Sequence, residues 1–191
     1  MAKIELLSPI IARWEGGFVN DPADRGGATN KGVTITTWMS QGWDIDGDGD
    51  IDVADLKLLS NKDFQFILGK YWNRWQADLI KNQSIANLLV DWVYCSGIWG
   101  IRIPQRVLKV VADGRVGKVT IGVLNGSNQE EIFKAIWDER KKFLLNLAVN
   151  SVLKYEKKIG RISTAQEQLK YTDKRFIKGW IGRLNSFRFA S

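Results

Sequence analysis

The chain has 191 residues, of which 45% are hydrophobic, so it can bury the core of one sizeable domain or of two small lobes. It contains no histidine, which excludes a Ser-His-Asp triad, a histidine general base and every histidine-containing zinc or iron site. Its net charge of +7 favours an anionic partner: nucleic acid, phospholipid or an acidic wall polymer.

The first predicted element is an amphipathic helix that ends at Glu15. Hydrophobic residues recur at three- and four-residue steps over residues 6–14, and two glycines then favour a helix end. Residues 20–32 are rich in Gly, Asn and Asp, which predicts a long loop or a small irregular hairpin. Because a long structured loop beside a helix end is often functional, we expect a site here.

Residues 44–55 have the pattern of an EF-hand calcium loop. Aspartates at alternate positions offer oxygen ligands, and Gly49 permits the sharp turn. The predicted metal ligands are Asp44, Asp46, Asp48, Asp50, Asp52 and Asp55. Asp55 stands where an EF-hand has Glu, which resembles the dockerin loop, but no second loop follows, so a cohesin-type partner is not expected. We expect structural Ca²⁺, with a merely solvated acidic loop as the alternative.

The rest of the chain is predicted to be helical. Hydrophobic spacing, capping residues and breakers predict helices over residues 64–75, 85–95, 105–111 after Pro104, 127–149 with Ser127 as the cap, and 176–184. Few β signals occur, so the predicted class is mainly α. We expect a first region over 1–90, which contains the acidic loop, and a second over 91–191, packed as one compact unit. Cys95, the one cysteine, cannot form an intrachain disulfide and is expected to be buried.

Glu15 and the loop after it carry the residue types of a glycosidase site. Cleavage of a glycosidic bond needs a protonated carboxylic acid at the leaving oxygen and usually a second carboxylate. Glu15 is the candidate acid, since apolar neighbours such as Trp14 and Phe18 disfavour the ionised form of a carboxyl. Asp21 or Asp24 can supply the second group. The alternative without a catalytic role is an exposed Glu beside a glycine turn, with both aspartates in Asx-turns.

This segment resembles glycoside hydrolase family 108, bacterial and phage muramidases that are also described as secretion activator proteins. The family pattern is Glu-Gly-Gly-Tyr followed by Asn-Asp-Pro-x-Asp-x-Gly-Gly-x-Thr-Asn-x-Gly-Ile-Thr, and here only Phe18 for Tyr and Val33 for Ile depart from it. The resemblance implies a lysozyme-like helical fold and an N-acetylmuramidase that cuts between N-acetylmuramic acid and N-acetylglucosamine in peptidoglycan. Glu15 would be its essential acid, and the Glu, Asp, Thr order of phage lysozymes favours Asp24 and Thr29 as catalytic partners.

The second half resembles the peptidoglycan-binding region that accompanies this family. The matching features are Asp91 at a helix, Gln105 and Leu108 on the next, a turn over 112–117 and a final Lys-Gly-Trp-x-x-Arg at 178–183. Peptidoglycan is therefore the expected partner. Aromatic rings bind apolar sugar faces, and Trp43 is one plausible groove residue. The predicted substrate-binding residues are Phe18, Asp21, Asn30, Thr34, Trp38, Trp99 and Trp180.

Two other functions compete with the muramidase. A non-catalytic peptidoglycan-binding or secretion or phage-assembly accessory protein would keep the fold after losing activity. A nucleic-acid-binding protein fits the charge, but the lysines and arginines are dispersed on helical patterns and no recognition motif is present, so no nucleic acid is expected. Without a signal peptide or a stretch long enough for membrane insertion, we expect synthesis in the cytoplasm and prophage-type release to the cell wall by a holin, lysis or another non-classical route.

Overall fold

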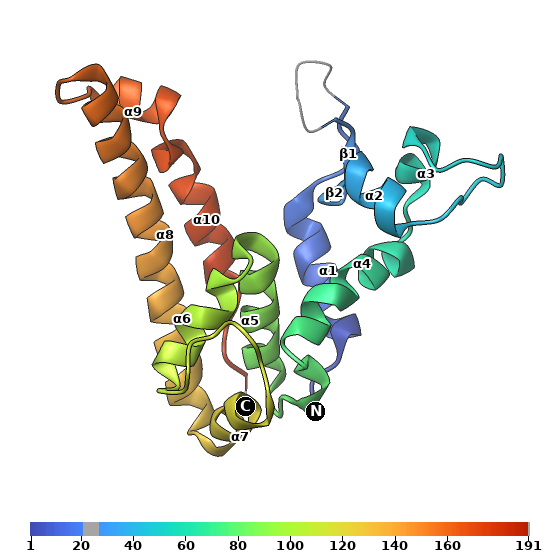
Figure 1. Ribbon diagram of the computed structural model, residues 1–191, viewed down its shortest axis with the longest axis horizontal. Helices are drawn as coiled ribbons and strands as arrows, with labels where there is room; N and C mark the ends of the chain where they lie inside the picture. The colour runs from blue at the N-terminus through green and yellow to red at the C-terminus, as the bar shows by residue number, and fades with distance from the viewer. Residues whose placement is uncertain (21–26, 191) are drawn as a thin grey trace. The chain divides into compact units, whose positions relative to one another are not determined.

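The computed structural model describes residues 1–20 and 27–190, and the chain divides into two compact units, Met1–Leu79 and Ile80–Ser191. The described residues form ten α-helices, two short 3₁₀ helices and one two-stranded hairpin (Figure 1), which confirms the mainly α class and the small hairpin. None of the described helices combines the length and the apolar character that crossing a membrane requires.

The first unit packs short helices beside the hairpin. Its elements are α1 (Ile4–Glu15), β1 (Thr29–Asn30), β2 (Val33–Thr34), α2 (Ile35–Gln41), α3 (Val53–Leu58), α4 (Asn61–Arg74) and the 3₁₀ helix η1 (Ala77–Leu79). Helices α1 and α4 pack against each other, and Leu7, Ile11, Phe64 and Leu68 are completely buried. Ser60 caps α4 by accepting a hydrogen bond from the Asp63 amide, which fixes where that helix begins. This core anchors the end of α1, where Glu15 lies.

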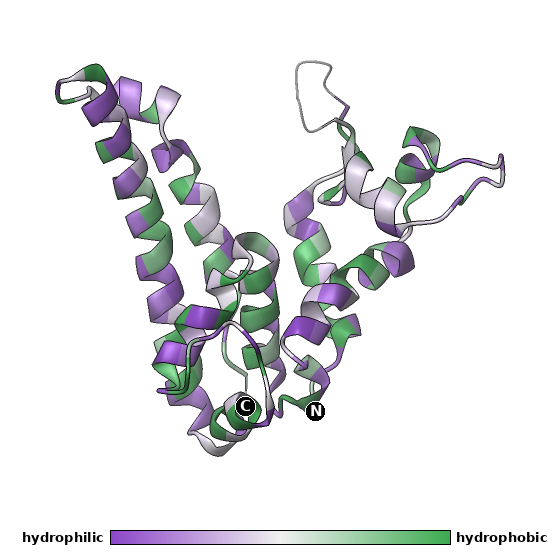
Figure 2. Ribbon diagram, viewed as in Figure 1, coloured by the Kyte–Doolittle hydropathy of each residue, from purple (hydrophilic) through white to green (hydrophobic). Residues whose placement is uncertain are grey.

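The second unit is built on one long helix. Its elements are α5 (Gln83–Ser96), α6 (Trp99–Val107), α7 (Lys118–Gly126), α8 (Gln129–Ile159), α9 (Ala165–Tyr171), the 3₁₀ helix η2 (Asp173–Phe176) and α10 (Ile177–Asn185). Helix α8 packs against α5, α6, α7 and α10. Helix α5 is largely hydrophobic (Figure 2), and its residues 85–93 are all buried. Cys95, expected to be buried, is exposed, because burial ends in the last turn of α5.

Two helices differ most clearly from their expected bounds. Helix α6 begins at Trp99 with Pro104 inside it, because α5 already ends at Ser96 and the next residue, Gly97, has a positive φ of 56°. Helix α8 continues to Ile159, ten residues beyond the predicted end, since no breaker occurs before Gly160. Its N-cap is Asn128 rather than Ser127, and the Asn128 side chain accepts hydrogen bonds from the amides of residues 130 and 131.

A buried charge cluster ties three helices of the second unit together. The carboxylate of Asp91 in α5 is completely buried and accepts hydrogen bonds from Arg140 Nη2 of α8 at 2.6 Å and Arg183 Nη2 of α10 at 2.7 Å. The Arg140 side chain is only 3% exposed, so its charge depends on Asp91 for compensation. The cluster therefore fixes the relative positions of α5, α8 and α10.

Glu167 in α9 should make stability depend on pH. A bidentate bond from Arg161, at 2.6 and 3.0 Å, together with the Thr164 amide, lowers the pKa of Glu167 to about 2 from its ordinary 4.5. Because the folded-state pKa lies below the unfolded one, this stabilisation is present above pH 4.5 and is lost as the pH falls towards 2. We expect Glu167→Gln to lower the urea midpoint at pH 7, with the deficit shrinking below pH 4.5. A deficit that does not change with pH would contradict this assignment.

Candidate active site

Glu15 is the last residue of α1 and lies at the edge of the first unit's core. Its side chain is half-buried, and the next residue, Gly16, turns the chain with a φ of 72° that favours glycine. The flanking rings of Trp14 and Phe18 are 39% and 37% exposed. Glu15 thus lies at a helix end, flanked in the chain by two aromatic residues whose side chains are partly exposed.

An antiparallel bridge brings the segment after Glu15 next to the hairpin. Val19 and Thr29 exchange both backbone hydrogen bonds at 2.8 Å, and Thr29 pairs in turn with Thr34. Because side chains directly opposite each other share one face of a sheet, the Thr29 and Thr34 side chains lie together. The turn between β1 and β2, residues 31 and 32, has positive φ at both positions, as two-residue hairpins of this kind require.

The other predicted residues of this site have different surroundings. Thr34 is the N-cap of α2 and accepts a hydrogen bond from the Thr37 amide. Asn30 is buried, and its Nδ2 donates to the Leu56 carbonyl at 2.7 Å, so its amide joins the hairpin to α3. Trp38 is completely buried, which makes it part of the core and leaves no ring face for a sugar. Asp21 and Asp24, predicted to belong to this site, lie outside the described residues.

Lys57 is a neighbour of the site that the sequence did not indicate. Its Nζ lies 5.3 Å from the centre of the Phe18 ring, a cation–π distance. The carbonyl of Lys57 also receives a longer hydrogen bond of 3.4 Å from Asn30 Nδ2. These contacts dock α3, the helix that follows the acidic loop, onto both the hairpin and the segment after Glu15. The contact joins residues 39 positions apart in the chain, so no local motif signals it.

The acidic loop gathers its carboxylates into two groups of three. Within each group the carboxylate oxygens lie within 4.8 Å of one another, and the groups are Asp44, Asp46, Asp48 and Asp50, Asp52, Asp55. Such oxygen-rich sets fit a hard divalent cation, and either group can hold a metal. The arrangement differs from a single ring of ligands, and Asp55 is also engaged with the backbone. Its carboxylate accepts hydrogen bonds from the amides of residues 45, 46 and 52.

The electrostatics of the loop reflect this crowding. The pKa of Asp50 is raised mainly by the charge of Asp48, and the pKa of Asp46 is raised mainly by desolvation. The backbone hydrogen bond from Asp52, followed by bonds from the Ile45 and Asp46 amides, lowers the pKa of Asp55. The loop therefore combines a carboxylate that caps α3 with others that repel one another, a repulsion that a bound cation would relieve.

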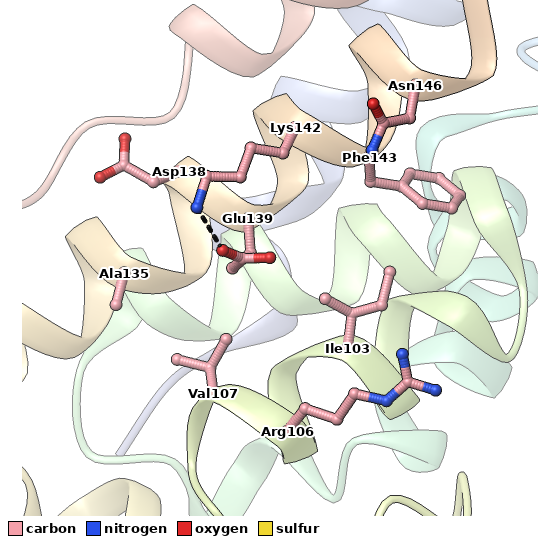
Figure 3. Close-up of a pocket in the computed structure, with 9 residues that line it drawn as sticks. All are labelled: Ile103, Arg106, Val107, Ala135, Asp138, Glu139, Lys142, Phe143 and Asn146. Carbon is pink, nitrogen blue, oxygen red and sulfur yellow. Dashed lines mark hydrogen bonds and ion pairs between the residues drawn. The ribbon is translucent and has the colours of Figure 1, made fainter. Parts of the chain in front are cut away.

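The second unit offers a separate pocket between α6 and α8, with a volume of about 620 Å³. Figure 3 shows the side chains that line it, among them the apolar Ile103, Val107 and Phe143, and the ion pair in which Lys142 Nζ lies 2.6 Å from Glu139. The other polar lining residues are Arg106, Asp138 and Asn146. The lining of the pocket thus combines apolar side chains with both signs of charge. The sequence did not indicate it, because its two walls come from different helices.

The two tryptophans predicted to bind substrate in the second unit are both accessible to some degree. Trp99, the first residue of α6, is 45% exposed. Trp180 in α10 is half-buried, and its ring stacks on Phe176 with 5.9 Å between ring centres. Each ring therefore keeps a face or an edge for a ligand.

Comparisons with known proteins divide the chain in two. Residues 8–97 match the family model described as Glycosyl hydrolase 108, and residues 99–185 match one described as Predicted Peptidoglycan domain. The chain is also similar to a solved structure titled "Structure of Brucella abortus SagA", with 23% sequence identity, a TM-score of 0.66, and coverage of 96% of this chain and 90% of that chain. At this identity the likeness concerns the fold. A comparison with curated proteins gives no match.

Proposed function

Because this chain belongs to the glycosyl hydrolase 108 family, with a predicted peptidoglycan domain behind its hydrolase domain, we propose that it is an N-acetylmuramidase in which Glu15 is the general acid. The family implies glycoside hydrolase activity, and the two domains together suggest a peptidoglycan hydrolase. The bond, between N-acetylmuramic acid and N-acetylglucosamine, and the residue roles are our proposal. The observation that carries it is the half-buried Glu15 at the end of α1, followed by a segment bridged to Thr29.

The mechanism follows from the chemistry of carboxyl groups. A protonated Glu15 would donate its proton to the glycosidic oxygen as the bond breaks and the sugar gains positive charge. Thr29 and Thr34, paired on one face of the hairpin, would hold water or a sugar hydroxyl near that centre. Asp24 is the proposed second carboxylate, with Asp21 as a ligand of the sugar. The Phe18 ring would pack against an apolar sugar face, with Lys57 behind it.

The second unit would hold the polymer while the first cuts it. Peptidoglycan carries short peptides that have both amino and carboxylate groups, and the lining of the α6–α8 pocket offers both charges in return. We assign this pocket to the peptide and Trp99 and Trp180 to glycan contacts. We propose that the fold of the first unit is lysozyme-like. The route by which the protein reaches the wall stays a prediction from sequence.

Incubation with purified peptidoglycan tests the proposed function directly. The protein should release soluble fragments at a rate that rises with its concentration. Sedimentation with the polymer, without soluble fragments after long incubation, would instead support the non-catalytic wall-binding function. Submicromolar, salt-sensitive binding to nucleic acid would support the third function.

We further propose that the acidic loop binds Ca²⁺ and that the ion is structural. Ca²⁺ would neutralise the repelling carboxylates and fix the start of α3, which carries the contacts to Asn30 and Phe18. We expect Ca²⁺ to raise the thermal midpoint of the parent by differential scanning fluorimetry, by an amount equivalent to about 2.7 kcal/mol at a hundred times its Kd. The Asp44→Asn/Asp48→Asn variant should not respond.

The matched control is Glu130→Gln/Glu131→Gln, which removes two carboxylates from the start of α8, outside the loop. It should respond to Ca²⁺ as the parent does. A parent that shows no shift with Ca²⁺, compared with chelator, would contradict the calcium assignment. The same experiment with Mg²⁺ shows whether a loop with aspartate at the closing position also binds the smaller ion.

A further inference from the structure

The net charge of the chain is concentrated in one part of the second unit. Residues 141–178, here called the distal arm, comprise the later part of α8, all of α9 and η2, and the start of α10. The arm contains ten lysines and arginines and three acidic residues, a net charge of +7. The remainder of the chain contains eighteen basic and eighteen acidic residues and is neutral. The neutral remainder divides into a first unit with eight basic and twelve acidic residues and the rest of the second unit with ten basic and six acidic residues. The distal arm therefore has the largest excess of positive charge and should attract an extended anionic surface most strongly.

The same arm exposes aliphatic side chains. On one face of α8, at four-residue steps, Leu145, Val149 and Leu153 are 43%, 55% and 57% exposed. They line an apolar groove of about 310 Å³ together with Ile177 of α10. Ile162, between α8 and α9, is 84% exposed. Figure 2 shows hydrophobic and hydrophilic residues interleaved along α8. Exposed aliphatic groups in such numbers indicate a surface that becomes covered.

Aromatic rings and cations are paired at the far part of the arm. Lys170 Nζ lies 5.1 Å from the centre of the Tyr171 ring, which stacks on Tyr155. The guanidinium of Arg175 lies 4.5 Å from the centre of the Phe176 ring. Tyr171 and Phe176 are 54% and 43% exposed. Aromatic residues beside cations, with aliphatic groups around them, are typical of segments that lie in the interface of a bilayer.

We propose that the distal arm binds the surface of membranes that contain anionic phospholipid, lying in the interface without crossing the bilayer. The lysines and arginines would contact lipid phosphates, and Leu153, Ile162 and neighbouring aliphatic groups would enter the boundary between headgroups and acyl chains. A nucleic acid or an anionic glycan would satisfy the cations but not the aliphatic groups, which is why a lipid surface is favoured. This activity is separate from the proposed muramidase and does not depend on it.

Sedimentation of the full chain with vesicles tests the proposal. The probes are vesicles of phosphatidylcholine alone and of phosphatidylcholine mixed with phosphatidylglycerol. The parent should bind only the anionic vesicles. An apolar variant, Leu153→Ser/Ile162→Ser, and a charge variant, Lys157→Gln/Lys158→Gln, should each bind at least about tenfold more weakly. The matched control Val119→Ser, at a residue of α7 that is 72% exposed and outside the arm, should bind like the parent.

Three results would overturn the proposal. One is equal binding to both kinds of vesicle. Another is binding that salt abolishes but the apolar variant leaves intact, since that would indicate a general polyanion surface. The third is that the parent self-associates on size-exclusion chromatography and that the apolar variant loses this self-association but still binds vesicles. All substituted side chains are exposed, so folding should persist by circular dichroism. Fragment release from lipid-free peptidoglycan should stay at the parent's rate.

Discussion

Glu15→Gln is expected to lower the rate of fragment release from peptidoglycan by a factor on the order of 10² to 10⁴, the usual contribution of a general acid. Glutamine keeps the shape and hydrogen-bonding capacity of the side chain but cannot give up a proton to the glycosidic oxygen. The half-buried position at the end of α1 should tolerate it. The measurement is the initial rate of soluble reducing-end formation, with thermal unfolding to confirm the fold.

The control is Glu5→Gln in the first turn of the same helix. Glu5 is exposed, and Gln65 donates a long hydrogen bond of 3.4 Å to it. This variant should retain the parent's rate. If Glu15→Gln also retains it within about twofold, the assignment of the acid is wrong, whatever the family implies.

Asp91→Asn should be the most destabilising of the substitutions considered. It leaves Arg140, whose side chain is 3% exposed, without a compensating charge, and loss of one partner from a buried pair costs about 3–5 kcal/mol. The variant should lower the free energy of unfolding of the second unit by about that amount in urea titrations followed by circular dichroism. Asp91 lies in the second unit, so an intact first unit should still unfold with its own transition.

Glu139→Gln provides the comparison, because it also removes a carboxylate paired with a cation at 2.6 Å. That pair is solvent-exposed, with side-chain exposures of 40% and 66%, and such pairs contribute about 0–1 kcal/mol. If the two variants lose equal stability, the buried cluster is not what joins α5, α8 and α10.

Local sequence signals predicted much of the candidate site. The hydrophobic period over residues 6–14 and the glycines after Glu15 are neighbours in the chain, and they suffice to end α1 at Glu15, as the structure confirms. The glycine- and asparagine-rich stretch predicted a long loop or a small irregular hairpin, and a hairpin forms whose two turn residues, Lys31 and Gly32, both have positive φ. The Asp91 and Arg183 positions, noted only as parts of a family pattern, turn out to be ion-pair partners.

Long-range packing accounts for the features of the candidate site that could not be predicted from the sequence. Trp38 was expected to line a groove, but tertiary contacts bury it completely, and nothing in its neighbours distinguishes a core ring from a sugar-binding ring. Lys57 contacts Phe18 through packing between distant segments, and the hydrogen bond from Asn30 joins the same helix, α3, to the hairpin. The six aspartates of the loop fit one calcium pattern in sequence, whereas in the structure their carboxylates gather in two groups of three, with Asp55 also bound by backbone amides.

Mass spectrometry of the soluble products from purified peptidoglycan tests the central claim most directly. We expect fragments that end in reducing N-acetylmuramic acid, formed by the parent and absent with Glu15→Gln. Fragments that end in reducing N-acetylglucosamine, or cleavage within the peptides alone, would contradict it.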